Sequence, residues 1–116
     1  MFIFRRLFQT AASPEAMSAK TKAQKIIDEN GVAVFSKSWC QYCNATKRLL
    51  DSLGAKYYAL DLDLVSDGSE IQAALEEISG QRTVPNVFIN RKHIGGNSDV
   101  QGRKDLRNLL AEAGAI

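Results

Sequence analysis

The sequence contains few cysteines, few histidines and little net charge, and each shortage excludes a class of protein. Two cysteines among 116 residues are too few for a small secreted scaffold that depends on several disulfides. These cysteines and a single histidine also fall short of the four ligands of a typical structural zinc site. A formal net charge of +2 gives no electrostatic reason to expect nucleic-acid binding. No apolar run approaches the roughly 20 residues of a membrane-spanning helix, so the sequence predicts neither nucleic acid nor a membrane as a partner.

The beginning of the chain differs in composition from the rest. Residues 1–16 include Arg5 and Arg6 and contain no acidic residue before Glu15. Acid-poor, arginine-containing amphipathic segments are typical of mitochondrial targeting peptides. We therefore predict a mitochondrial targeting extension at 1–16; a disordered tail and an additional docking helix are the alternatives. Met17 offers a second start for an untargeted form, so the predicted location is mitochondrial, cytoplasmic or both.

The remainder of the chain, residues 17–116, is long enough for one compact domain. Apolar residues at helical spacing, β-branched apolar runs and glycine stops predict these elements in order: a helix at 18–30, a strand at 32–35, a helix at 41–53, a strand at 56–62, a helix that ends at Gly80, a strand at 87–89, a turn at 90–93, a brief strand that ends at 95–96, and a last helix. Strands joined by a helix are expected to be parallel, and strands joined by a tight turn antiparallel. The order predicts an α/β fold.

Two further signals place the starts of the third and last helices. Ser69 is followed three residues later by Gln72, and Ser98 by Gln101. This spacing is typical of a capping box, in which the serine closes the first turn of a helix. We therefore expect one helix to open at each serine. The last helix is expected to be continuous, with an apolar face made by Leu106, Leu109, Leu110 and Ala113.

Both cysteines lie in one short segment, KSWCQYC at residues 37–43. Cys40 falls between a predicted strand and a predicted helix, where unpaired N–H groups and the helix dipole stabilise a thiolate. Lys37 adds a nearby positive charge, whereas Cys43, one turn inside the helix, is expected to remain a thiol. A structural disulfide in so small a loop restrains the unfolded chain little, and His93 is expected to be a hairpin surface residue far from the pair. The segment therefore predicts a redox centre.

Two motifs downstream accompany the cysteine pair: RTVP at residues 82–85 and GGNSD at residues 95–99. With KSWCQYC, in this order and spacing, they resemble the glutaredoxins, a branch of the thioredoxin superfamily. The resemblance covers residues 18–116. It implies a thioredoxin-like fold with a four-stranded mixed β-sheet flanked by helices, and glutathione as a thiol cofactor.

The resemblance also implies where glutathione binds. In this family the residue before proline, here Val84, presents its backbone to the cysteine part of glutathione, and Thr83 and Pro85 flank it. The resemblance implies that Pro85 is cis, and residues preceding proline are extended in any case. The expected contacts for the γ-glutamyl end are Gly96, Asn97, Ser98 and Asp99.

Other family positions surround the remainder of the glutathione molecule. Lys37, Arg82 and Gln72 match positions near its glycine carboxylate, although the capping box with Ser69 explains Gln72 equally well. Tyr42 is expected to line the groove beside the tripeptide, with a packed surface aromatic as the alternative.

Together these features predict a dithiol glutaredoxin, a glutathione-dependent thiol–disulfide oxidoreductase. Cys40 is expected to attack glutathionylated or disulfide-containing proteins, and Cys43 to resolve the mixed disulfide in the dithiol route. No dinucleotide-binding glycine pattern is present in the sequence, so electrons are expected to come indirectly, through a separate glutathione reductase. The predicted state is a monomer.

Gln41 departs from the usual dithiol motif, which has proline after the first cysteine. Family members that lack this proline sometimes bind a [2Fe–2S] cluster between two protomers, and the alternative prediction is therefore a cluster carrier, dimeric when loaded, with Cys40 as the metal ligand. No other residue is predicted to bind metal. A thioredoxin-like reductant fed by a protein reductase is a third hypothesis, although Gln41-Tyr42 and the GGNSD segment argue against it.

Overall fold

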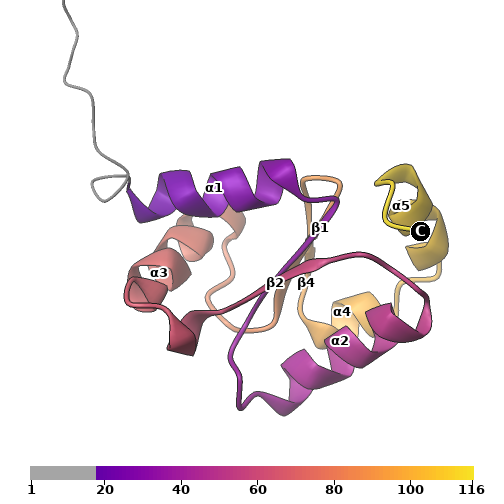
Figure 1. Ribbon diagram of the computed structural model, residues 1–116, viewed down its shortest axis with the longest axis horizontal. Coiled ribbons are helices and arrows are strands. Elements are labelled where there is room, and N and C mark those ends of the chain that lie inside the picture. The colour runs from indigo at the N-terminus through magenta and orange to yellow at the C-terminus, as the bar shows by residue number, and fades with distance from the viewer. Residues whose placement is uncertain (1–17) are drawn as a thin grey trace, which may run out of the picture.

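The computed structural model describes residues 18–116, and Figure 1 shows a central sheet with helices on both sides. The elements are α1 (Ala19–Glu29), β1 (Val32–Ser36), α2 (Gln41–Ser52), β2 (Tyr58–Asp61), the 3-10 helix η3 (Leu62–Leu64), α3 (Gly68–Ser79), β3 (Asn86–Ile89), β4 (Lys92–Gly95), α4 (Asn97–Gln101) and α5 (Leu106–Glu112). The predicted targeting extension at 1–16 lies outside the described residues. Within 18–116, no helix has both the length and the apolar character needed to cross a bilayer.

The four strands form one mixed sheet in the order β2-β1-β3-β4. β1 pairs with β2 in parallel, whereas β3 is antiparallel to both β1 and β4. The β3–β4 hairpin turns at Asn90 and Arg91, which have φ values of 52° and 66°, as a two-residue hairpin with the favoured twist requires. The predicted α/β fold with a four-stranded mixed sheet flanked by helices is confirmed.

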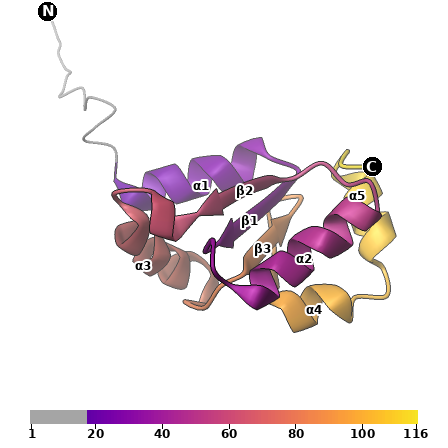
Figure 2. The same cartoon turned by 60° about the horizontal axis from the view of Figure 1, so that its bottom comes forward.

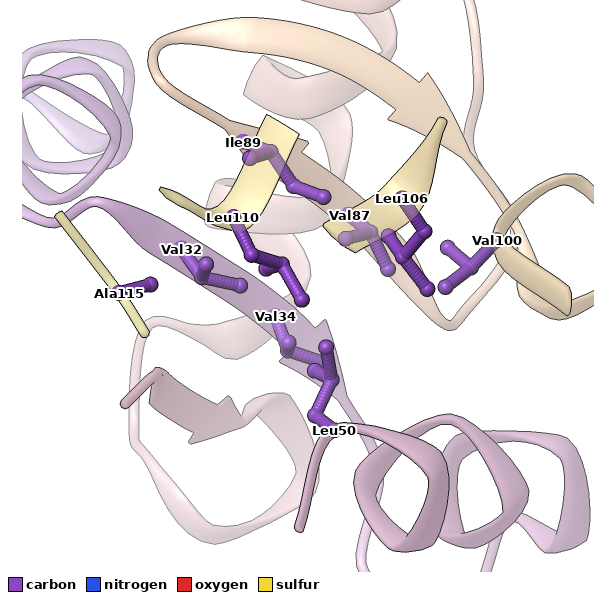
Figure 3. Close-up of a cluster of buried hydrophobic side chains, with 9 residues drawn as sticks. All are labelled: Val32, Val34, Leu50, Val87, Ile89, Val100, Leu106, Leu110 and Ala115. Carbon is purple, nitrogen blue, oxygen red and sulfur yellow. The ribbon is translucent and has the colours of Figure 1, made fainter. Parts of the chain in front are cut away.

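Each face of the sheet carries its own core, because successive side chains of a strand point to opposite faces. Val32 and Val34 of β1 belong to a cluster with α2, α4 and α5 (Figure 3). Ala33 and Phe35 belong to a second cluster with α1 and α3, and Figure 2 shows these two helices on one side of the sheet and α2 and α4 on the other. β1 is fully buried and contributes side chains to both cores. The loop that follows its last residue leads to the cysteine pair.

The predicted single helix at the end of the chain is wrong, because the structure divides it into α4 and α5. Gly102 ends α4, and glycine in a helix interior costs about 1 kcal/mol relative to alanine. The N–H of Arg103 donates to the carbonyl of Val100 at 3.2 Å, which is a tighter turn than an α-helix. The break allows Val100 of α4 and Leu106 of α5 to enter the same core.

Both predicted capping boxes are also wrong. α3 begins at Gly68, before Ser69, without a side-chain cap, and Gln72 donates instead to the carbonyl of Arg82 at 2.9 Å. α4 follows Gly96 rather than Ser98. At α3, Gly68 admits the close approach of the Leu62 carbonyl, whereas at α4 the Asp99 carboxylate accepts the N–H of Gly96 and provides the cap instead of Ser98.

The second strand is shorter than the predicted 56–62. The N–H of Lys56 donates to the carbonyl of Ala115 at 2.8 Å, which ties this part of the chain to the C-terminal segment instead of to β1. At the other end, Leu62 begins η3 and is buried. Strand pairing is therefore limited to Tyr58–Asp61.

Candidate active site

Cys40 occupies the N-cap position of α2, directly after the loop that leaves β1. Its Sγ accepts the N–H of Cys43 at 3.2 Å, which is the bond that an N-cap oxygen usually accepts. Only 7% of the residue is exposed, and Sγ lies 3.9 Å from the carbonyl oxygen of Val84. The predicted placement at a strand–helix junction is confirmed, and the sulfur is held by a donor that a negatively charged nucleophile needs.

Cys43 lies one turn further and is fully buried. Burial, followed by the hydrogen bond with Cys40, raises the pKa of its thiol to about 12, although the backbone of Lys37 and the ammonium of Lys47 act in the opposite direction. Both cysteines are free thiols in this structure. Cys43 therefore stays protonated at neutral pH, as the sequence predicted.

Lys47, one turn after Cys43 in α2, belongs to a polar cluster with Asp61 and Ser36. Its Nζ lies 3.1 Å from Asp61 Oδ1, and the buried hydroxyl of Ser36 donates to the same oxygen. Ser36 and Asp61 are paired residues at the ends of β1 and β2, so the sheet register fixes this cluster. It places one partly buried positive charge on the helix that carries Cys43.

The raised pKa of Cys43 predicts a loss of stability in alkaline solution. Between the ordinary thiol pKa of 9.0 and the folded value of about 12, the unfolded chain has released a proton that the folded chain retains. Each pH unit in this window therefore lowers the free energy of unfolding, by at most about 1.4 kcal/mol. The stability from the neutral buried thiol is complete below the unfolded pKa and is lost as pH rises toward the folded value.

Urea unfolding under reducing conditions, at about pH 8 and about pH 10, measures this loss. Lysine titration contributes in the same range, so Cys43→Ser provides the control, and its stability is expected to fall less steeply with pH. An equal fall in both proteins would contradict the assignment to Cys43.

A groove opens beside Cys40, with a volume of about 330 Å³. Its lining consists of residues that the sequence predicted to contact glutathione: Tyr42, Thr83, Val84, Pro85, Gly96, Asn97 and Ser98. The peptide bond between Val84 and Pro85 is cis, as the resemblance implied. Tyr42 is 70% exposed, so its ring is a wall of the groove rather than a packed residue. Three segments that are distant in sequence thus surround one hollow.

The GGNSD segment forms the far wall of this groove at the start of α4. Asp99 Oδ2 accepts the N–H of Gly96 at 2.9 Å, and a Cβ at Gly95, whose φ is 128°, would lie 2.3 Å from that oxygen. Glycine is therefore required at position 95. Asn97, which also lines the groove, accepts the hydroxyl of Thr46 through Oδ1 at 2.9 Å, and this bond ties the wall to α2.

The remaining predicted contacts lie on the other side of Cys40. Lys37 and Gln72 line a second hollow of about 310 Å³ with Trp39, and Lys37 Nζ lies 5.8 Å above the Trp39 ring. Arg82 lines neither hollow; its guanidinium lies 3.3 Å from Glu76. Lys37 and Gln72 therefore share one hollow, and the exposed Arg82 guanidinium pairs with Glu76 of α3.

Asp63 is a site residue that the sequence reasoning missed. It accepts both the N–H of Ser38, at 2.9 Å, and the Ser38 hydroxyl, and these two bonds lower the pKa of its carboxyl. Ser38 lies in the loop before Cys40, so Asp63 fastens this loop to η3. No local signal connects residues 25 positions apart; the parallel pairing of β1 with β2 brings them together.

Residues 18–116 of one chain do not gather the ligands of a metal centre. In the part of the chain that the structure describes, no three His, Cys, Asp or Glu side chains are grouped to hold a metal. Cys43 is fully buried, so Cys40 alone is placed to ligate an external group. A [2Fe–2S] cluster takes four ligands, and one chain therefore supplies one of them.

Comparison with known proteins gives consistent matches. The family model "Glutaredoxin" matches residues 32–94. A glutaredoxin of Ricinus communis is 54% identical over 101 residues, which cover 84% of this chain and 99% of that relative. Glutaredoxin-C2 of Arabidopsis thaliana is 52% identical over 101 residues, with coverage of 84% and 91%. Among solved structures, the buckwheat glutaredoxin–glutathione complex has a TM-score of 0.83 at 50% identity and covers 84% of this chain and 92% of its own.

Proposed function

Because this chain belongs to the glutaredoxin family of glutathione-dependent oxidoreductases, we propose that it reduces protein–glutathione mixed disulfides and protein disulfides through Cys40. The observation that carries the proposal is the position of Cys40. Its sulfur lies at the N-terminus of α2 and 3.9 Å from the carbonyl of Val84, beside a groove lined by the residues expected to hold glutathione. The structure with a TM-score of 0.83 is a glutathione complex, which supports glutathione as the ligand.

The first step transfers the glutathionyl group to the enzyme. The Cys40 thiolate attacks the glutathione sulfur of the mixed disulfide, and the substrate protein leaves as a thiolate that takes a proton from solvent. One disulfide forms while another breaks, so the number of disulfides is unchanged. The groove around Val84 holds the glutathionyl group during this transfer, with the tripeptide extended along the loop backbone.

The second step restores Cys40. A second glutathione, as its thiolate, attacks the glutathione sulfur of the Cys40 adduct, and glutathione disulfide leaves. The cap position favours Cys40 as a leaving group, because the Cys43 N–H and the helix N-terminus stabilise the negative charge that it regains. Each turnover converts a mixed disulfide and one glutathione into a free protein thiol and glutathione disulfide. A separate glutathione reductase would return the glutathione disulfide to the thiol.

The dithiol route needs Cys43. When Cys40 attacks an intramolecular protein disulfide, one substrate sulfur leaves and the other stays bound to Cys40. Cys43 then attacks Cys40 Sγ as its thiolate, the substrate leaves as a thiolate, and the proton given up by Cys43 is taken up by that leaving thiolate. The Cys43 thiol is buried in the first turn of α2 and is hydrogen-bonded to Cys40, so the resolving group already lies beside the sulfur that it attacks. The Cys40–Cys43 disulfide is afterwards reduced by two glutathione molecules.

Replacing Cys43 by serine separates the two routes and tests the proposal. The full-length Cys43→Ser protein is expected to keep most of its activity on a glutathionylated peptide, since this reaction needs only Cys40. Its reduction of an intramolecular protein disulfide is expected to fall at least about tenfold, because no internal thiol resolves the adduct. NADPH oxidation through added glutathione reductase measures the first rate, and gel-shift alkylation of the substrate measures the second.

The control is the unmodified protein without glutathione. Turnover under those conditions, with a protein reductase as the electron source, would support the thioredoxin-like hypothesis instead. A Cys43→Ser protein that loses both activities equally would contradict the assignment of attack to Cys40 and of resolution to Cys43.

The remaining parts of the sequence reading stay predictions. A [2Fe–2S] cluster would need Cys40 from two chains and two further thiolates, for which glutathione is the expected source. Monomeric state, the identity of the substrate proteins and a mitochondrial or cytoplasmic location are proposals on the same footing. Among them, the targeting role of 1–16 is independent of the redox chemistry.

A further inference from the structure

The amide of Gln81 bridges two carbonyl groups on either side of Val84. Gln81 Nε2 donates to the carbonyl of Thr83 at 3.1 Å and to that of Pro85 at 3.0 Å. An amide nitrogen has two hydrogens to donate, so these two bonds use its full capacity. One side chain therefore holds the carbonyls of the residues before and after Val84.

A second glutamine holds the carbonyl that precedes Thr83 in the same loop. Gln72 Nε2 donates to the carbonyl of Arg82 at 2.9 Å. The carbonyl of Val84, in contrast, has only the long contact with Cys40 Sγ at 3.9 Å. Among the described residues, Val84 is thus the position in this loop whose carbonyl is left for a strong external donor.

The backbone of Gln81 is hydrogen-bonded to Ser79 and to the buried Asn86. Its N–H donates to Ser79 Oγ at 3.1 Å, and its carbonyl accepts Asn86 Nδ2 at 3.1 Å. Asn86 is 1% exposed, and because its amide nitrogen donates, its Oδ1 accepts from His93 Nε2 at 3.0 Å. Gln81 is therefore held from the buried side by a network that reaches β4.

Gln81 also lies against the opposite wall of the groove. A Cβ built at Gly96 would be 3.9 Å from Gln81 Nε2 and 3.6 Å from the carbonyl oxygen of Pro85. The amide therefore sits between the Val84 loop and the start of α4.

We propose that Gln81 is a positioning residue for the glutathionyl group: it directs the backbone of Val84 into the groove by occupying the carbonyls of Thr83 and Pro85. The inference rests on the proposed glutathione-dependent function. An extended ligand that pairs with a loop backbone needs that backbone in one orientation, and a loop that must be ordered at the moment of binding lowers affinity. Cys40 is placed by α2 and η3, so Gln81 is not needed to hold the nucleophile.

Gln81→Met tests this proposal because methionine keeps the length of the side chain and removes both donors. We expect kcat/KM for a glutathionylated peptide to fall about tenfold, as expected for the loss of hydrogen bonds that order the loop. The same peptide disulfide-linked to 2-mercaptoethanol has no tripeptide to bind, and its kcat/KM is expected to change less than about twofold. The ratio of the two values is the readout, because general damage to the fold would lower both.

Two further variants complete the test. Gln81→Arg retains N–H donors and is expected to keep the ratio within about threefold of the original. Gln24→Met removes a glutamine amide whose partner is Asp28, on the exposed face of α1, and is expected to have no effect. If Gln81→Met does not fold, as judged by its thermal melt, Gln81→Glu serves instead, because a carboxylate facing two carbonyls should lower the ratio further.

The outcomes distinguish a failure of the proposed glutathione-dependent function from a failure of the role assigned to Gln81. An unmodified protein that does not prefer the glutathionylated substrate would overturn the proposed function itself. A clear preference that is unchanged in Gln81→Met, or Gln81→Glu where that variant is used, would overturn the role of Gln81 alone. A parallel loss on both substrates would also overturn it, since the residue would then act on the fold or on Cys40.

Discussion

Cys40→Ser is expected to lose glutathione-dependent reduction by at least about a thousandfold, because a serine hydroxyl forms no disulfide and is a weak nucleophile without a base. The loss should be chemical and not structural. Serine is among the best N-cap residues, so its oxygen can accept the Cys43 N–H that Cys40 Sγ accepts at 3.2 Å. The thermal melting temperature of the variant should therefore stay close to that of the unmodified protein.

Two measurements check this prediction. The coupled assay with a glutathionylated peptide gives the rate, and mass spectrometry after exposure to glutathione disulfide shows whether the chain carries a glutathionyl group. Cys43→Ser is the matched control, because it also exchanges one sulfur for one oxygen within the same turn of α2, and it should still accept the group. Activity retained by Cys40→Ser would show that Cys40 is not the nucleophile.

Gly68→Ala is expected to lower the free energy of unfolding by about 3 kcal/mol, at the upper end of the range for overpacking a core. A Cβ at this position would lie 1.8 Å from the carbonyl oxygen of Leu62 and 2.8 Å from its carbonyl carbon. Both atoms belong to the backbone, so no side-chain rotation relieves the overlap. Either η3 or the start of α3 must move, and Leu62 and Gly68 are both buried.

This strain should also reach the cysteine loop. Asp63, next to Leu62, holds the N–H and hydroxyl of Ser38, two residues before Cys40. A displaced η3 would loosen these bonds and reduce turnover in addition to stability. Urea unfolding and the coupled assay measure the two effects, with Ser69→Ala as the control, since Ser69 is an exposed neighbour in the same helix. A loss no larger than that of Ser69→Ala would contradict the steric argument.

The fold class could be predicted because its determinants are local. The apolar run at 32–35 and the helical spacing after Gln41 depend on side chains a few residues apart, and both elements form where expected. The same local pattern placed Cys40 at the start of α2 and Cys43 inside it. Errors arose where the local signal competed with tertiary contacts. Ser69 and Ser98 have the spacing of caps, yet both helices begin earlier, because Gly68 admits the Leu62 carbonyl and Asp99 caps the N–H of Gly96.

The amino-acid sequence alone determined the order of helices and strands, the redox character of the cysteine pair and the family resemblance, because each follows from short stretches read along the chain. Tertiary structure decided which distant groups meet. The parallel register of β1 and β2 set Ser38 against Asp63, and packing of α2 beside the 82–85 loop set Cys40 against Val84, 44 positions away. The two donors of Gln81 have no sequence signature, because any polar residue suits an exposed loop. Only the folded loop turns its carbonyls toward that side chain and leaves the backbone of Val84 for a ligand.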